Sequence, residues 1–183
     1  MIATVHPTAT VADSAVVSGD VTIGAGSRIL PGVVLHGDLG PVRIGADVVV
    51  MEHAVLRGRA DHPVEVGDAV LVGPHAHLNG TVVEDEVFVA TGVAMFPGSR
   101  AGTGSELRIR SVLHVGSRLE PGAVLPIGWI AAGDPAQLFS PDRHDELWAV
   151  QERLDFPGTV WGVPRGAPMR EVMRRMSETF RPQ

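Results

Sequence analysis

The sequence contains no cysteine, no lysine and no tyrosine, and the first two absences each remove a class of chemistry. Without cysteine there is no thiol nucleophile, no disulfide and no thiolate metal site. Without lysine no side-chain amine can form a Schiff base, because all 15 basic residues are arginine. Nucleophilic, acid–base and metal chemistry therefore falls to histidine, aspartate, glutamate, arginine, serine and threonine.

Other features are also missing. No apolar run approaches the ~18 residues of a membrane-spanning helix. The first residues lack the basic start and apolar core of a secretory signal, so the cytoplasm is the default expectation. A net charge of −6 argues against a nucleic-acid-binding surface.

The chain does contain a long series of aliphatic residues spaced six apart, which is the period neither of a helix nor of an ordinary strand. The members of this series are Val11, Val17, Ile23, Ile29, Leu35, then Ile44, Val50, Leu56, then Val66, Val72, Leu78, then Val83, Val89, Met95, and finally Leu107, Leu113, Leu119 and Leu125. Such spacing predicts an all-β fold, a parallel β-helix of hexapeptide repeats in which three hexads form one triangular coil. Successive coils should stack at the ordinary strand spacing of about 4.8 Å.

The repeat divides the chain into a predicted β-helix domain, residues 1–137, and a helical tail, residues 138–183. Two interruptions, residues 38–43 and 58–63, are expected to loop out at the same edge. In the tail, Ser140 and Pro141 predict the start of a helix that runs to about residue 154. A loop is expected over residues 156–168 and a second amphipathic helix after it, packed on the β-helix or on a neighbouring subunit.

Three stretches resemble the gamma-class carbonic anhydrase-like family: LHGDLGPVRIG at residues 35–45, residues 72–80, and GDPA at residues 133–136. The resemblance covers roughly residues 5 to 140. It implies a left-handed β-helix, a homotrimer, and a zinc ion held by histidines from two adjacent subunits. It also implies a small-molecule substrate, since members hydrate CO2 or have diverged to thioesterase or unassigned roles.

Most functional positions of that family are changed here. Asp38 matches the first-loop motif, but His36 replaces its arginine, and Met51 and Glu52 replace a Gln-Asp pair. The three positions that correspond to the family's zinc histidines hold Arg57, Pro74 and Asn79. Arginine, proline and asparagine are poor zinc donors or none at all, so the usual metal site is expected to be absent.

Two groups of residues remain as candidate sites. His53, His75 and His77 lie near one corner of successive coils and suggest a relocated zinc site, completed by a residue across the subunit interface, or else surface histidines that hydrogen-bond to each other or to water. His36, Arg57 and Asn79 each follow a core residue and should stack in one column. With Asp38 and Glu52 they suggest a metal-free catalytic pocket, or else a salt-bridge network, Arg57 with Asp38 or Glu52, that holds the trimer together.

Three functional hypotheses therefore stay open. The first is a trimeric carbonic anhydrase-like enzyme that acts on a small molecule at the subunit interface, with CO2 hydration weak or absent. The second is a hexapeptide-repeat acyltransferase that uses acyl-CoA, and the third is a non-catalytic structural subunit. His6, His114 and His144 have no convergent partners in the sequence and are expected at the surface or at an interface.

Overall fold

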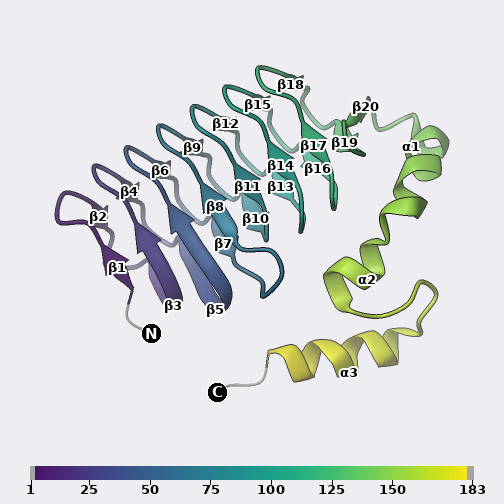
Figure 1. Cartoon of the computed structure of the whole chain (residues 1–183), viewed down its shortest axis with the longest axis horizontal. Coiled ribbons are helices and arrows are strands. Elements are labelled where there is room, and N and C mark those ends of the chain that lie inside the picture. Colours follow the sequence, from purple (N-terminus) through teal and green to yellow (C-terminus); the bar gives the residue numbers. More distant parts are fainter. Residues whose placement is uncertain (1–2, 181–183) are drawn as a thin grey trace.

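The computed structural model describes residues 3–180, which form a left-handed parallel β-helix followed by short helices (Figure 1). Each turn has three faces of short strands that pair in parallel with the turns before and after. No helix among residues 3–180 is both long and apolar enough to cross a bilayer.

Two of the three faces join into one 13-stranded sheet, because β3 and β5 run around a corner. The first face contains β3 (Val16–Ile23), β5 (Val34–Ile44), β7 (Val55–Arg57), β10 (His77–Asn79), β13 (Ala94–Met95), β16 (Val112–Leu113) and β19 (Ile130–Ala132). The second contains β1 (Thr4–Val5), the later halves of β3 and β5, β8 (Val64–Val66), β11 (Val82–Val83), β14 (Arg100–Ala101) and β17 (Arg118–Leu119).

The third face is a separate seven-stranded sheet. Its strands are β2 (Thr10–Val11), β4 (Arg28–Ile29), β6 (Val49–Val50), β9 (Leu71–Val72), β12 (Phe88–Val89), β15 (Glu106–Leu107) and β18 (Val124–Leu125). The last parallel strand of the β-helix is β19, with which β20 (Gln137–Phe139) pairs in the antiparallel direction.

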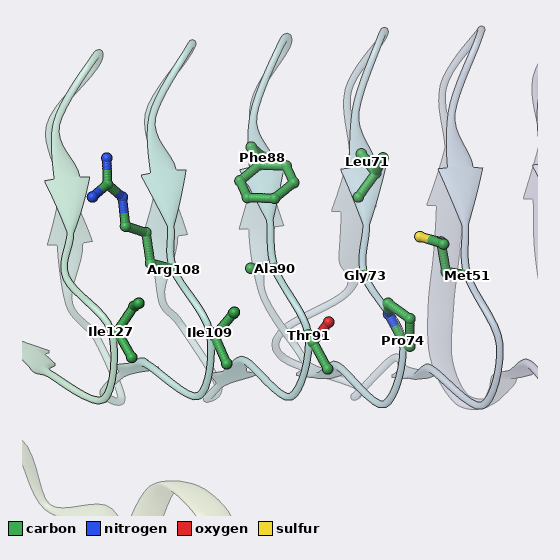
Figure 2. A pocket seen from close by; sticks show the side chains of 10 residues that line it. All are labelled: Met51, Leu71, Gly73, Pro74, Phe88, Ala90, Thr91, Arg108, Ile109 and Ile127. Atoms are coloured by element: carbon green, nitrogen blue, oxygen red, sulfur yellow. The ribbon is translucent and has the colours of Figure 1, made fainter.

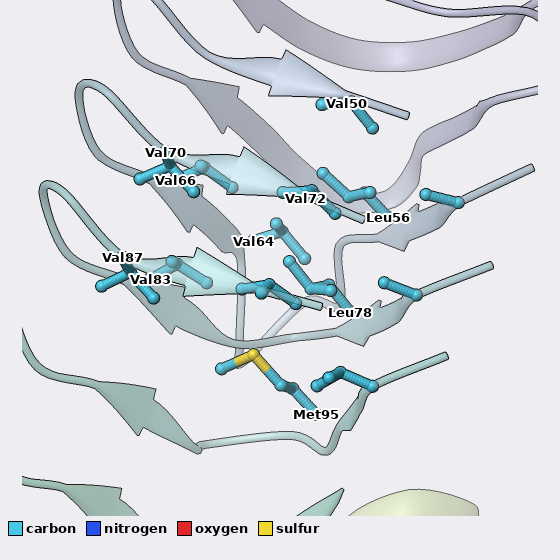
Figure 3. Close-up of a cluster of buried hydrophobic side chains, with 14 of the residues drawn as sticks. Val50, Leu56, Val64, Val66, Val70, Val72, Leu78, Val83, Val87 and Met95 are labelled. Atoms are coloured by element: carbon cyan, nitrogen blue, oxygen red, sulfur yellow. The ribbon is translucent and has the colours of Figure 1, made fainter. Parts of the chain in front are cut away.

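The hexad residues form the core, as the repeat predicts (Figure 3). From Ile23 to Leu125 every member of the series is at most 4% exposed, and residues from adjacent coils stand directly in register. Ala101 is fully buried at a hexad position that the aliphatic series skips, between Met95 and Leu107. The repeat therefore continues without a break through the second half of the β-helix, with a small residue at one position.

Only one of the two interruptions is a loop. Residues 38–43 lie inside the 11-residue strand β5, which pairs with β3 across a register irregularity between Gly19 and Val21. The expectation of a first loop is therefore wrong. Residues 58–63 do leave the β-helix, and their start packs closely on β5. A Cβ atom on Gly58 would lie 2.0 Å from the carbonyl oxygen of Gly40, so only glycine permits this approach.

The tail differs from the sequence prediction at its start and its middle. The first helix, α1 (His144–Gln151), has Arg143 rather than Ser140 as its N-cap and continues into the 3₁₀ turn η1 (Glu152–Leu154). The segment predicted as a loop contains α2 (Phe156–Trp161). This helix forms because the carboxylate of Asp155 accepts a hydrogen bond from the Gly158 amide and caps the first turn.

The last helix, α3 (Met169–Thr179), lies where its apolar spacing predicts, but it buries little of its apolar stripe. Val172 is buried, whereas Met169 and Met173 are 61% and 50% exposed. The tail leaves the C-terminal end of the β-helix and folds back along it (Figure 1). It thereby reaches the corner that carries the predicted polar column.

Candidate functional site

The predicted column of polar side chains exists on the first face. Arg57 is paired in register with His36 on one side and with Asn79 on the other. Each of the three follows a fully buried leucine, so the inward packing of Leu35, Leu56 and Leu78 sets the position of the polar residue after it. The same column begins one rung earlier at Ser18, which is paired with His36. It continues through Phe96 and His114, which follow the register-paired residues Met95 and Leu113.

Polar atoms inside this column lack partners. Among the residues that the structure describes, His36 Nδ1, Arg57 Nε and Asn79 Oδ1 are buried and make no hydrogen bond. Asn79 as a whole is only 6% exposed. An unpaired buried polar atom costs about 1–3 kcal/mol, so three on adjacent rungs make the column a candidate binding site.

Asp38 joins the column at its N-terminal end. Ser18 Oγ donates a hydrogen bond of 2.5 Å to Asp38 Oδ2, and His36 Nε2 lies 3.6 Å from the same oxygen. The 3.6 Å separation is too long for a hydrogen bond but brings a carboxylate and an imidazole together. Ser18 was not among the predicted site residues, although it lies one coil before His36 at the same place in the repeat.

Arg57 makes neither of the ion pairs that the sequence suggested. Within the described part of the chain it has no carboxylate partner, and its guanidinium carbon lies 5.1 Å from the centre of the Phe180 ring. Glu52 does not reach the column. It lies in the turn between β6 and β7, and its carboxylate makes no hydrogen bond or ion pair with any described residue. A salt-bridge network of Arg57 with Asp38 or Glu52 is thus absent within one chain.

His53 and His75 occupy a turn position rather than a strand. Their φ angles are 60° and 57°, and the corresponding places in other coils hold glycine with positive φ, such as Gly32 and Gly92. The two rings stack as expected, with centroids 5.3 Å apart and planes 14° from parallel. Both side chains are exposed. Histidine tolerates this left-handed conformation better than most residues, which is a structural reason for its presence.

His77 lies on β10, beyond the turn that holds His75. Burial, and then the positive charge of Arg57, lower the pKa of His77. Residues 3–180 contain no group of three or more histidine, aspartate or glutamate side chains placed to hold a metal ion. His53, His75 and His77 therefore do not form a zinc site within a single chain.

The family's metal positions do not fit a metal here either. Pro74 lies at the turn before β10 and Asn79 at the end of that strand. The two positions therefore lie on either side of the strand, whereas zinc bonds are about 2 Å long. The side chains of Arg57, Pro74 and Asn79 do not suit zinc in any case.

The far end of the column is covered by the tail. His114 is 4% exposed, which contradicts the expectation of a plain surface residue. Its ring centroid lies 5.5 Å from that of Phe156, which also contacts Phe96 at 5.1 Å and Trp161 at 5.5 Å. Both ring nitrogens of His114 lack a hydrogen-bond partner, and burial lowers its pKa. The sequence offered a signal for this residue, because His114 stands at the same place in the repeat as Asn79.

A second feature, which we call the apolar hollow, lies on the third face beside Pro74 (Figure 2). It has a volume of about 480 Å³ and is lined by side chains from successive coils, among them Leu71, Phe88, Ile109 and Ile127. Phe88, Ile109 and Ile127 are 42%, 45% and 63% exposed. Large apolar side chains gathered in this way are typical of a surface that another protein chain covers.

Comparison with known proteins agrees with the fold and identifies relatives. No family model matches the chain. It is 31% identical over 149 residues to gamma carbonic anhydrase 1, mitochondrial, of Arabidopsis thaliana, which covers 78% of this chain and 52% of the relative. The chain thus spans about half the length of that protein. It is also 31% identical over 179 residues to carnitine operon protein CaiE of Escherichia coli (strain K12), which covers 97% of this chain and 88% of CaiE.

The crystal structure of a UDP-N-acetylglucosamine acyltransferase superimposes with a TM-score of 0.62 at 17% identity, over 96% of this chain and 78% of that one. This likeness shows the fold alone. The protein is therefore a hexapeptide-repeat β-helix protein. Within that class, the sequence relatives show that it belongs to the gamma carbonic anhydrase-like and CaiE family.

Proposed function

We propose that this protein is a homotrimeric member of its family that has lost the usual zinc ligands and acts on a small polar molecule between two subunits. The observation that carries the proposal is the set of unpaired buried atoms on His36, Arg57 and Asn79. Such atoms are satisfied by a substrate or by a neighbouring subunit, and a cleft between subunits offers both. CO2 hydration is expected to be weak or absent.

The two corners of the coil support the trimer. The polar column lies at one end of the first face, and Pro74 with the apolar hollow lies at the other. A three-fold arrangement would bring the Pro74 corner of one copy against the column of the next. The hollow supplies exposed apolar surface that such a contact would bury, at about 25 cal/mol per Å².

The side chains of the column suit acid–base chemistry on a polar substrate. His36, whose Nε2 lies 3.6 Å from the Asp38 carboxylate, would exchange a proton with the substrate. Arg57 would place a fixed positive charge where negative charge develops in the reaction. No step requires a metal, since the residues at the family's metal positions do not suit one.

The oligomeric state tests the proposal most directly. Light scattering coupled to size-exclusion chromatography should give the mass of three chains for the natural protein. Ile109→Asp, in the apolar hollow, should shift that mass toward one chain because it places a charge on the buried contact. Trp148→Asp removes an equally exposed apolar side chain on α1 and should leave the trimer intact. A monomeric natural protein, or loss of the trimer in both variants, would overturn the proposal.

Two further measurements separate the alternatives. Zinc shared between His53, His75, His77 and a second copy stays a prediction, tested by metal analysis of protein purified without a tag. Acetyl-CoA tests acyl transfer, because a ligand at 100 times its dissociation constant adds about 2.7 kcal/mol of stability. A trimer whose stability and oligomeric state alone respond to changes at His36 and Asp38, with no ligand bound, would point to a structural subunit.

A further inference from the structure

A second cavity lies between residues 58–63 and the two last helices, apart from both the column and the apolar hollow. Its volume is about 530 Å³, within the range of small-molecule sites. Arg59, Asp61 and His62 line it from the β-helix side, and Asp155, Thr159 and Arg175 line it from the tail. The lining is mainly polar, unlike that of the apolar hollow.

Arg59 is held in place before any ligand arrives. Its Nη2 donates hydrogen bonds to the carbonyl oxygens of Thr159, at 3.2 Å, and Val160, at 3.0 Å. Its backbone exchanges two hydrogen bonds with that of His62, of 2.9 and 3.2 Å, which closes the turn. The turn also packs tightly on Gly80, where a Cβ atom would lie 2.8 Å from the His62 carbonyl oxygen. A side chain fixed in this way loses little entropy on binding.

Ion pairs compensate the arginine charges at this cavity only weakly. Within the described residues Arg59 pairs with no carboxylate, and the ion pair of Arg175 with Glu178 is long, at 4.0 Å. Burial, and then the nearby charge of Arg57, lower the pKa of Arg59.

Two carboxylates, those of Asp61 and Asp155, also line the cavity and formally balance the two arginine charges, but neither forms an ion pair with Arg59 or Arg175 among the described residues. The Asp155 carboxylate is engaged at the start of α2, where it caps the Gly158 amide. Asp61 is exposed to solvent, and its attraction is the last of the three influences on Arg59. Arg59 thus lines the cavity from the β-helix side and Arg175 from the tail.

We propose that this cavity binds a small organic anion, a carboxylate or a phosphate monoester, between the guanidinium groups of Arg59 and Arg175. Guanidinium groups match the geometry of both anions and bind them through paired hydrogen bonds. The hydroxyl groups of Thr159 and Thr179 and the imidazole of His62 line the rest of the space. The site is built from different residues than the column, so it does not depend on the reaction proposed there.

Isothermal titration of the full chain with inorganic phosphate and with citrate tests the site, with sodium chloride at matched ionic strength as the background. Saturable binding of at least one probe is expected. Arg175→Gln removes one of the two guanidinium groups and should weaken binding at least tenfold. Arg175 makes no side-chain hydrogen bond with any described residue, so the substitution should leave the fold intact. Arg59→Lys keeps the charge but not the planar fork, and should weaken it several-fold. Arg170→Gln, exposed on the same helix, is the matched control and should bind as the natural protein does.

The relative strength of phosphate and citrate distinguishes the two anion classes. The proposal is overturned if neither probe gives saturable binding to the natural protein, or if Arg175→Gln binds as Arg170→Gln does. Circular dichroism and melting temperature of each variant show whether the tail remains folded. The titration measures neither turnover nor oligomeric state. A failure of this site can therefore be distinguished from a failure of the proposed function.

Discussion

His114 combines burial with two unpaired ring nitrogens, and this combination has a consequence for stability. Burial lowers the pKa of His114 in the folded chain, while the unfolded chain retains the ordinary value of about 6.5. Between that value and the lowered pKa, the unfolded chain binds a proton that the folded chain does not. The contribution of His114 to the free energy of unfolding is therefore fully present above about pH 6.5 and decreases as the pH falls below that value. His77, whose pKa is also lowered, contributes in the same direction.

We predict that His114→Phe raises the free energy of unfolding by about 1–3 kcal/mol, because it removes buried polar atoms that have no partner. The new ring would lie among Phe96 and Phe156, which already contact the histidine. The decrease of stability between pH 6.5 and 5 should also become smaller than in the natural protein. Urea denaturation at several pH values measures both effects. His144→Phe, at an exposed position of α1, should change neither, and a full pH dependence in His114→Phe would contradict the assignment.

For single residues, the sequence predicts the place of a side chain in the repeat better than it predicts what surrounds that side chain. The six-residue period placed His36, Arg57 and Asn79 in one column, and the register confirms it. It did not show that the column is partly covered, because the tail that covers it is distant in sequence. For His53 and His75, the same period would have shown that they stand where Gly32 and Gly92 stand. The repeat thus identifies a turn position, but it does not reveal the chemical role of the residue that occupies it.

The elements of the β-helix and those of the tail differ in how far sequence determines them. In the β-helix each hexad repeats the same local pattern, so even Ala101, whose side chain is only a methyl group, lies in register. In the tail, the glycine and proline content of residues 156–168 suggested a loop, so α2 was not predicted. That helix depends on one capping carboxylate and on contacts of Phe156 with residues about 40 to 60 positions earlier.

The cap of α2 provides a test at the scale of one element. Asp155 has a φ of 42° and caps Gly158, so Asp155→Ala loses the cap and also places alanine in a left-handed conformation. We predict a local loss of about 1–3 kcal/mol, which should release α2 from the column. Arg153 and Arg165 flank this helix, so trypsin should cleave there at least tenfold faster, and the fluorescence of Trp161 should change. Asp155→Asn retains an oxygen acceptor and tolerates the backbone angle, so equal cleavage of the two variants would contradict the prediction.

At the scale of the whole molecule, the stacking of coils follows from counting residues, but the contact between subunits does not. The surfaces that would meet are the polar column and the Pro74 corner, which lie at opposite ends of β10. The repeat places each surface on its own coil edge. The six-residue period contains no information on how two copies are arranged. The prediction of a trimer therefore rested on the family resemblance.

The family's metal geometry offers a way to measure that relation. We predict that the triple substitution Arg57→His, Pro74→His and Asn79→His creates a zinc site between subunits, because it restores imidazole at the three positions. Zinc should bind at about one ion per chain, and CO2 hydration should rise above that of the natural protein in stopped-flow measurements.

The double variant Arg57→His and Asn79→His lacks the ligand from the neighbouring copy and should bind zinc much more weakly. Adding Ile109→Asp to the triple variant should abolish tight zinc binding together with the trimer. Equal zinc affinity of the triple and double variants, or tight binding by a single chain, would show that positions 57, 74 and 79 do not converge between subunits.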